Sequence, residues 1–287
     1  MSEYHKALGE VAFRPGPPIP YVNTESMERF LNTPLDVSPL RKYSVPVVAL
    51  VLAVGIYSTD SNQVLFLFFN KLGPNTGDTL WANWTVLGDG LVVMVLALPF
   101  VGRQPLLVWA MVLTALIAGI LVPLLKQYFG LPRPPAVLAA DLIHIIGPAF
   151  KSRSLPSGHT TAAFAFAGVM SLYFRHFWVL VLTLGLAMGV GISRMAVGVH
   201  WPLDVAVGAG LGWLCAVVGC YLAGRWYWGE TLTGQRVISA ILIVAAFVLL
   251  LFFKADFPRA EWLPKGIAIT VLILSAPSLS RLWRRRT

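Results

Sequence analysis

Three polar strings stand beside membrane-length apolar segments and hold residue types that could do chemistry. The first runs from Lys126 to Pro134, the second from Ser154 to His159, and the third from Ser193 to Asp204. Their ionisable members are three cations, two histidines and one carboxylate: Lys126, Arg133, Arg194, His159, His200 and Asp204. Ionisable groups next to a bilayer are costly in free energy, which makes these residues functional candidates by default.

The basic residues and the Ser157-Gly158 pair suit a phosphate ligand. The guanidinium donors of Arg133 and Arg194 match the geometry of phosphate oxygens, and Lys126 adds a third positive charge. Ser157 and Gly158 directly precede an apolar run, so their hydroxyl and N–H groups would lie at the positive N-terminus of a helix. Glycine also lets the backbone approach a ligand closely. We therefore predict that these five residues hold a phosphoryl group.

The two histidines and Asp204 could supply the reacting groups. His200 and Asp204 are four residues apart, and Pro202 between them suits the first turn of a helix. On a helical turn, Asp204 would reach back to His200 and keep one ring nitrogen protonated. The other nitrogen would then be free to attack phosphorus. His159, which comes from a different helix, would donate a proton to the leaving oxygen.

The composition indicates that membrane helices position these residues. The chain has 287 residues, of which 57% are hydrophobic and 12% charged, with a mean hydropathy of +0.72. Soluble domains are roughly 45–50% apolar and about 25% charged, so a water-soluble single domain is excluded. Eight apolar runs approach the length of about 20 residues that a membrane helix needs; they lie at 43–57, 86–101, 105–125, 160–174, 177–193, 203–223, 236–253 and 264–280. The prediction is an all-α, polytopic membrane helix bundle.

The distribution of lysine and arginine predicts the orientation in the membrane. With the N-terminus in the cytoplasm, thirteen of these residues lie on the cytoplasmic side and nine on the other. This bias agrees with the positive-inside rule. Both termini are therefore expected in the cytoplasm and all three polar strings at the extracytoplasmic face. The formal net charge of +9 does not indicate nucleic-acid binding, because most basic residues lie at the ends of apolar runs.

Other segments carry local predictions. Residues 1–40 are polar and Pro-rich, which predicts a cytoplasmic tail with a short helix near residues 24–31. The segment Asp60–Gly73 is too short to cross the bilayer and has charges near both ends, which favours an interfacial helix. Glycines cluster at 185–191 and 208–212, and small residues of this kind predict closely packed membrane helices.

The three strings together resemble the signature of the type 2 phosphatidic acid phosphatase (PAP2) superfamily. That signature is Lys-x6-Arg-Pro, Pro-Ser-Gly-His and Ser-Arg-x5-His-x3-Asp. Every specified position matches in order and spacing: Lys126, Arg133, Pro134, Pro156, Ser157, Gly158, His159, Ser193, Arg194, His200 and Asp204. The resemblance implies a six-helix PAP2-like catalytic core over residues 41–225. Residues 226–287 would then add two C-terminal transmembrane helices with a basic end.

The resemblance also implies a phosphohistidine mechanism without a metal or any other cofactor. His200 would attack phosphorus, Asp204 would orient it, and His159 would protonate the leaving group and later activate water. The phosphoryl oxygens would be held by Lys126, Arg133, Ser157, Gly158 and Arg194. The implied protein is a lipid phosphatase of the cell (inner) membrane, similar to undecaprenyl-diphosphate and phosphatidylglycerophosphate phosphatases. Polyprenyl diphosphate heads the expected substrates, and no obligate protein partner is inferred.

Three other interpretations of the same residues remain open. A lipid phosphotransferase would pass the phosphoryl group from His200 to lipid A or to another lipid. A transporter or flippase would place ionisable groups near the bilayer centre, whereas the charges here are predicted to gather at one face. A zinc hydrolase would use four side chains, those of His144, His159, His200 and Asp204.

Polar residues between the first two strings have local interpretations. Asp141 and His144 are three positions apart and are predicted to form a hydrogen-bonded loop pair, with a metal pair as the alternative. Lys151 and Arg153 lie just before Ser154 on the same predicted face. They are candidate contacts to an anionic lipid headgroup, and otherwise solvated side chains.

Overall fold

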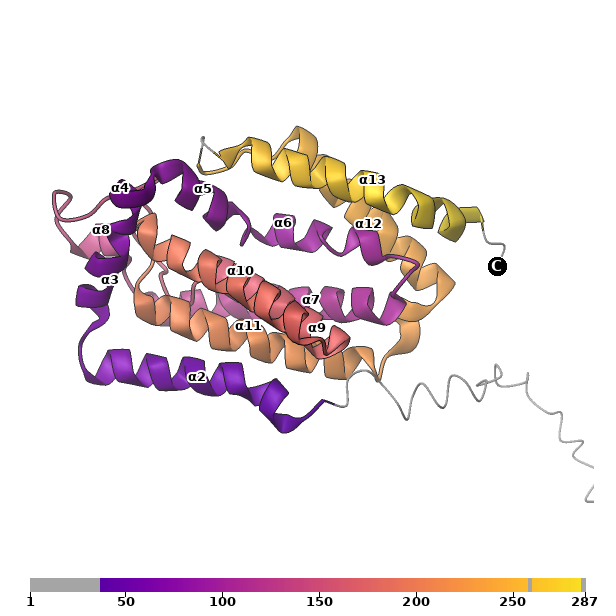
Figure 1. Cartoon of the computed structure of the whole chain (residues 1–287), viewed down its shortest axis with the longest axis horizontal. Helices are drawn as coiled ribbons and strands as arrows, with labels where there is room; N and C mark the ends of the chain where they lie inside the picture. Colours follow the sequence, from indigo (N-terminus) through magenta and orange to yellow (C-terminus); the bar gives the residue numbers. More distant parts are fainter. Residues whose placement is uncertain (1–36, 258–259, 285–287) are drawn as a thin grey trace, which may run out of the picture.

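A computed structural model describes residues 37–257 and 260–284, and this part of the chain is a bundle of helices without a strand (Figure 1). The long helices are α2 (Pro39–Ser58), α7 (Pro105–Phe129), α9 (Gly158–Phe174), α10 (Phe177–Ala196), α11 (Pro202–Ala223), α12 (Leu232–Leu251) and α13 (Trp262–Arg284). The short ones are α3 (Asn62–Asn70), α4 (Leu72–Thr76), α5 (Asp78–Val86), α6 (Gly90–Val95), η1 (Leu98–Phe100), α8 (Pro134–Val137) and η2 (Tyr227–Glu230). The all-α prediction is confirmed, and the helix expected near residues 24–31 lies outside the described residues.

Six of the described helices are long and apolar enough to cross a membrane, namely α2, α7, α10, α11, α12 and α13. The pair α5 and α6 passes the same test only if it counts as one broken span. Helix α9, which coincides with the predicted run at 160–174, has 17 residues. The helix α3 lies where the interfacial segment is predicted. Each of the eight predicted apolar runs thus coincides with helical structure.

The apolar run at 86–101 is not one continuous helix as expected. Helix α5 ends at Val86, α6 begins at Gly90, and the two are bent by 55°. The carboxylate of Asp89 causes a new helix to start, because it accepts the N–H groups of Leu91 (2.8 Å) and Val92 (3.3 Å). The break places Asp89 and its neighbours beside α9, where the site lies.

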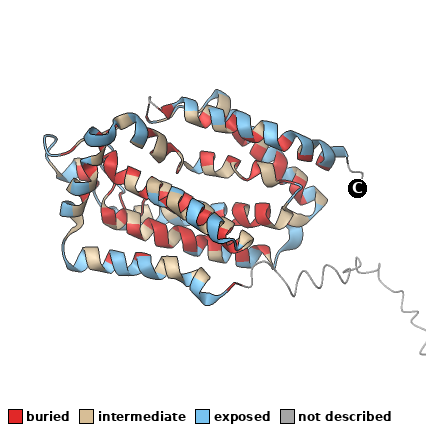
Figure 2. Cartoon of the chain, viewed as in Figure 1, coloured by how far each residue is buried: buried red, intermediate tan, exposed pale blue. Residues whose placement is uncertain are grey.

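Helices α9 and α11 lie inside the bundle, and more than half of the residues of each are buried (Figure 2). Helix α9 packs on α10 and α11, and α11 also packs on α2 and α7. Helix α2 lies on one side of the bundle and α13 on the opposite side, while α3, α4 and α8 gather at one end (Figure 1). The exposed side chains of α2 are largely apolar, as a lipid-facing helix requires.

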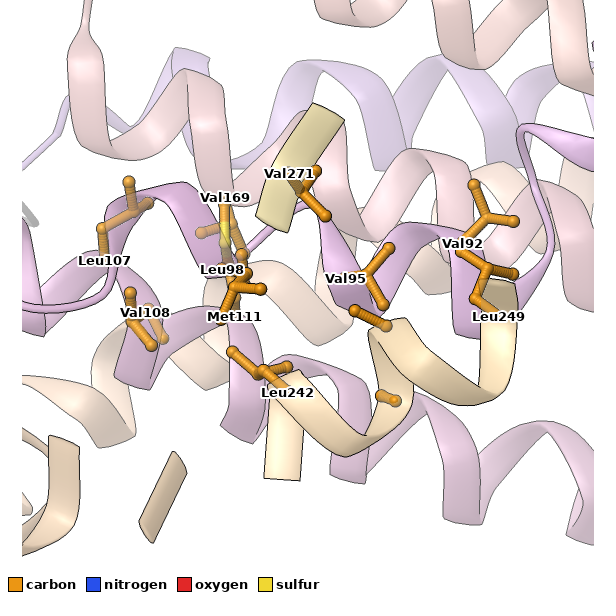
Figure 3. Packing of buried hydrophobic residues seen from close by; sticks show 14 of the residues in the cluster. Val92, Val95, Leu98, Leu107, Val108, Met111, Val169, Leu242, Leu249 and Val271 are labelled. Atoms are coloured by element: carbon orange, nitrogen blue, oxygen red, sulfur yellow. The ribbon is translucent and has the colours of Figure 1, made fainter. Parts of the chain in front are cut away.

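The C-terminal helices are part of the same core. Figure 3 shows Leu242 and Leu249 of α12 and Val271 of α13 among the side chains of α6, α7 and α9. Helix α12 packs on α13 and α6, and α13 also contacts η1. Gln235 of α12 accepts the N–H group of Gly102 (3.1 Å). The described residues of the C-terminal segment, 226–257 and 260–284, are therefore packed into the bundle.

The glycine clusters permit the close helix packing that the sequence predicts. A Cβ atom on Gly212 of α11 would meet the carbonyl oxygen of Thr161 in α9 and would lie 2.9 Å from the amide nitrogen of Ala165. We expect Gly212→Ala to lower the free energy of unfolding by about 1–3 kcal/mol, because α9 and α11 must move apart. Thermal or denaturant unfolding in detergent measures this change.

Gly185→Ala is the matched control for this substitution. A Cβ atom on Gly185 of α10 would meet nothing within 4 Å. Since alanine is the better helix former, the control should raise stability by up to about 1 kcal/mol. Equal shifts in the two variants would contradict the packing role of Gly212.

Candidate active site

The three polar strings meet at one end of the bundle, where backbone hydrogen bonds join them. The N–H group of Ser154 donates to the carbonyl of Leu131 (2.9 Å), which ties the second string to the first. The N–H group of Ser157 donates to the carbonyl of Asp204 (3.0 Å), which ties the second string to the third. Residues far apart in the sequence therefore share one site, as predicted.

His200 and Asp204 form a buried pair at the N-terminus of α11. Nδ1 of His200 lies 3.0 Å from Oδ2 of Asp204, and the two residues are 1% and 2% exposed. The same oxygen accepts the N–H group of Trp201 (2.9 Å) and the hydroxyl of Ser154. Three donors thus fix this carboxylate, which in turn fixes the imidazole. If Nδ1 carries the proton, Nε2 presents a lone pair.

The surroundings of His200 favour the neutral imidazole. Burial lowers the pKa of His200 well below its ordinary value of 6.5, and the charges of Arg133, Arg194 and Lys126 lower it further. His200 lies in the loop between α10 and α11, and its backbone N–H donates to the carbonyl of Arg194 (3.2 Å). The neutral form is the one in which an imidazole nitrogen can act as a nucleophile.

Arg133 and Lys126 are held by the loop that leads to α9. Nε of Arg133 donates to the carbonyl of Ser152 (2.9 Å), and one terminal nitrogen donates to that of Val199 (3.2 Å). A guanidinium has five N–H donors, so three remain for a ligand. Nζ of Lys126 donates to the carbonyl of Arg153 (3.2 Å). Backbone carbonyls therefore aim both cations without neutralising their charge.

Arg194 is the most deeply buried cation of the site, with 3% of its surface exposed. One terminal nitrogen donates to the hydroxyl of Thr85 in α5, whereas Nε has no hydrogen-bond partner among the described residues. A buried donor without a partner is rare in folded proteins and calls for a missing acceptor. An anionic ligand oxygen would satisfy it.

His159 is the second residue of α9, whose N-terminus begins at Gly158 with Ser157 as the preceding cap residue. The hydroxyl of Ser157 accepts that of Thr160 (2.9 Å). Within the described part of the chain, the imidazole of His159 makes no side-chain hydrogen bond. The helix terminus thus offers backbone donors, a hydroxyl and an unpaired imidazole at the same point.

The histidines and the cations lie within electrostatic range of one another. The charges of Lys126, Arg133 and Arg194 all act on His159 and also on His200. The two imidazoles interact with each other as well. The predicted nucleophile, proton donor and phosphate-binding charges are therefore gathered in one place.

Two cavities meet at His159. The larger, here called the apolar cavity, measures about 780 Å³ and lies between α6, α7, α9 and α12, with Trp226 and Trp228 at its far end. The smaller, here called the polar pocket, measures about 220 Å³; its lining is Val86, Asp89, His159 and residues 253–257. His159 is the one residue that the two cavities share.

The structure corrects the predicted pairing of His144 and adds contacts for the loop before α9. His144 does not pair with Asp141; its Nε2 lies 2.8 Å from Oδ1 of Asp78 at the start of α5. The side chains of Lys151 and Arg153 are exposed, and it is their backbone carbonyls that hold Arg133 and Lys126. Among residues 37–257 and 260–284, no three His, Cys, Asp or Glu side chains converge as metal ligands would.

The structure brings to the site several residues that the sequence does not identify as site candidates. Ser154 binds the carboxylate of Asp204, and Thr85 binds Arg194. Asp89 and Asp256 both lie within electrostatic range of Arg194. Ser154 stands inside a polar string and could have been included, whereas Asp256 lies in the loop between α12 and α13 and carries no local signal.

The fold and the site define a helical membrane protein with a cluster of cations and histidines at one end of its bundle. Residues 107–228 match the family model of the PAP2 superfamily. The crystal structure of Aquifex aeolicus LpxE is similar, with 32% identity and a TM-score of 0.51, over 55% of this chain and 93% of that one. The chain belongs to the PAP2 superfamily, and it is an integral membrane protein.

Curated relatives match shorter parts of the chain. A lipid A 1-phosphatase of Rhizobium etli is 33% identical over 109 residues, which are 34% of this chain and 43% of the relative. The bacitracin transport permease protein BcrC of Bacillus licheniformis is 48% identical over 65 residues, 22% of this chain and 30% of that one. The putative undecaprenyl-diphosphatase YbjG of Escherichia coli is 39% identical over 70 residues, which cover 24% of this chain and 33% of that protein. The chain thus aligns with less than half the length of these relatives.

Proposed function

We propose that this protein is a membrane lipid phosphatase that acts through a phosphohistidine on His200. One observation carries the proposal: the carboxylate-bound imidazole of His200 lies within electrostatic range of three cations and of the unpaired imidazole of His159. These are the parts that phosphoryl transfer through a covalent intermediate needs. The names of the relatives, a lipid A 1-phosphatase and a putative undecaprenyl-diphosphatase, support the same reaction class.

In the first step, Nε2 of His200 attacks the phosphorus of the substrate. The bond between phosphorus and the lipid oxygen breaks, and its electron pair stays on that oxygen. The negative charge of the bound phosphate favours the protonated form of His159, which donates its proton to the leaving oxygen. The products are phospho-His200 and the lipid alcohol, or the lipid monophosphate when the substrate is a diphosphate.

In the second step, water replaces the lipid. His159, now neutral, accepts a proton from the water molecule while the water oxygen attacks phospho-His200. The bond between phosphorus and nitrogen breaks, inorganic phosphate leaves, and both histidines return to their starting states. No metal or other cofactor is required by these steps.

The cations and the N-terminus of α9 stabilise the charge of the phosphoryl group in both steps. Arg194 offers an unpaired Nε, Arg133 has three donors left, and Lys126 adds a point charge. Ser157 and Gly158 supply a hydroxyl and a backbone N–H group. Because the protein already holds these groups in position, little reorganisation opposes the reaction.

The apolar cavity is where we place the hydrocarbon tail of the substrate. It begins at His159, which protonates the oxygen that carries the tail, and follows α7 from Pro123 to Trp109. At about 1.5 Å per residue this distance is about 21 Å, compared with about 30 Å for the hydrocarbon core of a bilayer. Polyprenyl diphosphate heads the proposed substrates, followed by lipid A and phosphatidyl phosphates, and the bilayer supplies them.

The orientation follows from the charge distribution. We propose that both termini are cytoplasmic and that the site opens at the extracytoplasmic face of the cell (inner) membrane. Labelling of single cysteines by a membrane-impermeant reagent tests this. A cysteine at exposed Asp141 should react from outside, and one at exposed Arg175 should not.

A substrate panel on the purified protein tests the proposed function. We expect release of inorganic phosphate from polyprenyl diphosphate, lipid A or phosphatidylglycerol phosphate, and we expect it to continue in EDTA. Phosphate that appears on an acceptor lipid rather than free would replace hydrolysis by phosphotransfer. No release from any of these lipids would overturn the proposal and favour a transporter.

The acid limb of the pH profile should report the state of His200. The neutral imidazole attacks, and since burial lowers the pKa of His200 below 6.5, activity should persist as the pH falls through 6.5 and decline only at lower pH. The measurement is kcat/KM against pH for two aryl phosphates whose own second pKa values differ. A limb that is shared by both substrates belongs to the enzyme. A shared limb centred at or above pH 6.5 would contradict the prediction.

A further inference from the structure

His159 stands between two cavities of different character. On one side lies the apolar cavity, whose lining is almost entirely hydrocarbon and whose proposed occupant is the lipid tail. On the other side lies the polar pocket, where four of the eight lining residues are titratable: Asp89, His159, Lys254 and Asp256. The side chains of Lys254 and Asp256 are exposed, so the pocket faces water.

The C-terminal hairpin builds one wall of this pocket. Residues 253–257 follow α12 and lead toward α13, and they lie outside the segment 107–228 that matches the family. Asp89, at the break between α5 and α6, forms the opposite wall and is held by the N–H groups that it caps. Apart from His159, the polar pocket is therefore made by parts of this chain other than the polar strings.

The second step of the proposed reaction needs one water molecule at His159 in every turnover. While the lipid is bound, its tail occupies the apolar cavity, and hydrocarbon excludes water. We infer that the polar pocket is the separate entrance through which hydrolytic water reaches His159. This inference rests on the proposed function and adds a role for the segment 253–257.

The size of the pocket agrees with water as its occupant. At about 30 Å³ per molecule, a volume of about 220 Å³ holds several waters. Pockets for drug-sized ligands start at about 300 Å³, so a second lipid does not fit here. A lipid acceptor would have to arrive through the apolar cavity, which the first lipid has to vacate. The pocket therefore favours hydrolysis over transfer to a lipid.

The charges around the pocket keep it hydrated without adding a strong anion site. Lys254 is opposed by two carboxylates, Asp89 and Asp256, and these also act on Arg194. Besides Arg194, the charged or titratable groups that interact with His159 are Lys126, Arg133 and His200. Phosphate is thus attracted to the cations of the polar strings rather than to this pocket, and the pocket stays open to water.

Ala255→Leu tests the entrance, because it adds a branched apolar side chain to the pocket wall. We expect turnover to fall about tenfold and the steady-state level of phosphoenzyme to rise, while single-turnover formation of the phosphoenzyme stays within twofold. Ala240→Leu is the matched control, since Ala240 is an exposed residue of α12 that lines neither cavity. Unchanged turnover, or equal slowing of both steps, would overturn the inference.

Hydrogen exchange at the imidazole C2 position in D₂O gives a readout that does not depend on activity. We expect Ala255→Leu to slow exchange at His159 at least fivefold and to leave His144, whose side chain is 37% exposed, unchanged. If Ala255→Leu fails to fold, Lys254→Leu at the mouth serves the same test. Unchanged exchange at His159 in a protein that releases phosphate overturns the entrance alone. Slowed exchange in a protein that releases none supports the entrance and overturns the proposed function.

Discussion

Replacement of His200 by alanine should abolish phosphate release and the phosphoenzyme together. Without the imidazole there is no nitrogen to form the covalent intermediate, and the carboxylate of Asp204 is left without its partner. We expect a loss of at least about 10⁴-fold in kcat, in the range found when nucleophiles of other enzymes are removed. Incubation with a substrate that carries radiolabelled phosphate, followed by rapid quenching, measures both free phosphate and acid-labile label on the protein.

His176→Ala is the control for this substitution. His176 is exposed and caps the N-terminus of α10, while His200 follows the C-terminus of the same helix. The control should keep both turnover and labelling within a few fold. Normal labelling in His200→Ala would show that another residue is the nucleophile.

The local part of the site was predictable from spacing. His200 and Asp204 meet because Asp204, in the first turn of α11, reaches back over the N-terminus of the helix to the Trp201 N–H and to His200, which lies just before that cap residue. Pro202 marks where the helix begins. The N-terminus of α9 at Gly158 follows from the change from a polar string to an apolar run. Both features depend only on residues that are close together in the chain, so local sequence patterns predict them.

The tertiary part of the site was not predictable in the same way. Asp78 and His144 are 66 residues apart, and no spacing rule links them. The role of residues 253–257 depends on how α12 packs against α6, which apolar periodicity does not specify. The start of a helix after Asp89 was predictable, since Gly88-Asp89-Gly90 combines two weak helix formers with a capping residue. The 55° bend between α5 and α6 was not, because the hydropathy of the run at 86–101 is continuous.

The positions of the ionisable groups distinguish a metal-independent phosphatase from the transporter and zinc-hydrolase interpretations. The ionisable groups that act on His159 and His200 belong to one end of the bundle, whereas a transporter would need them along a path through its middle. The zinc interpretation needed His144 beside the other two histidines. Its Nε2 is instead engaged by Asp78, beside α4 and α5.

Replacement of His159 by alanine should make the rate depend on the leaving group. An alkoxide or lipid phosphate is a poor leaving group and needs the proton that His159 supplies, so phosphoenzyme formation should slow by about 10²–10⁴-fold. A nitrophenolate leaves without a proton, so formation of the phosphoenzyme from an activated aryl phosphate should slow less than tenfold. The activated aryl phosphate is thus the control substrate for the same variant.

The measurement must isolate the first step, because His159 also activates water in the second. Steady-state turnover would fall for both substrates once dephosphorylation limits the rate, and the difference between leaving groups would disappear. Single-turnover formation of phospho-His200 avoids this, and the variant should accumulate phosphoenzyme from the aryl substrate. Equal slowing of phosphoenzyme formation with both leaving groups would remove the proton-donor role and leave His159 only as a base for water.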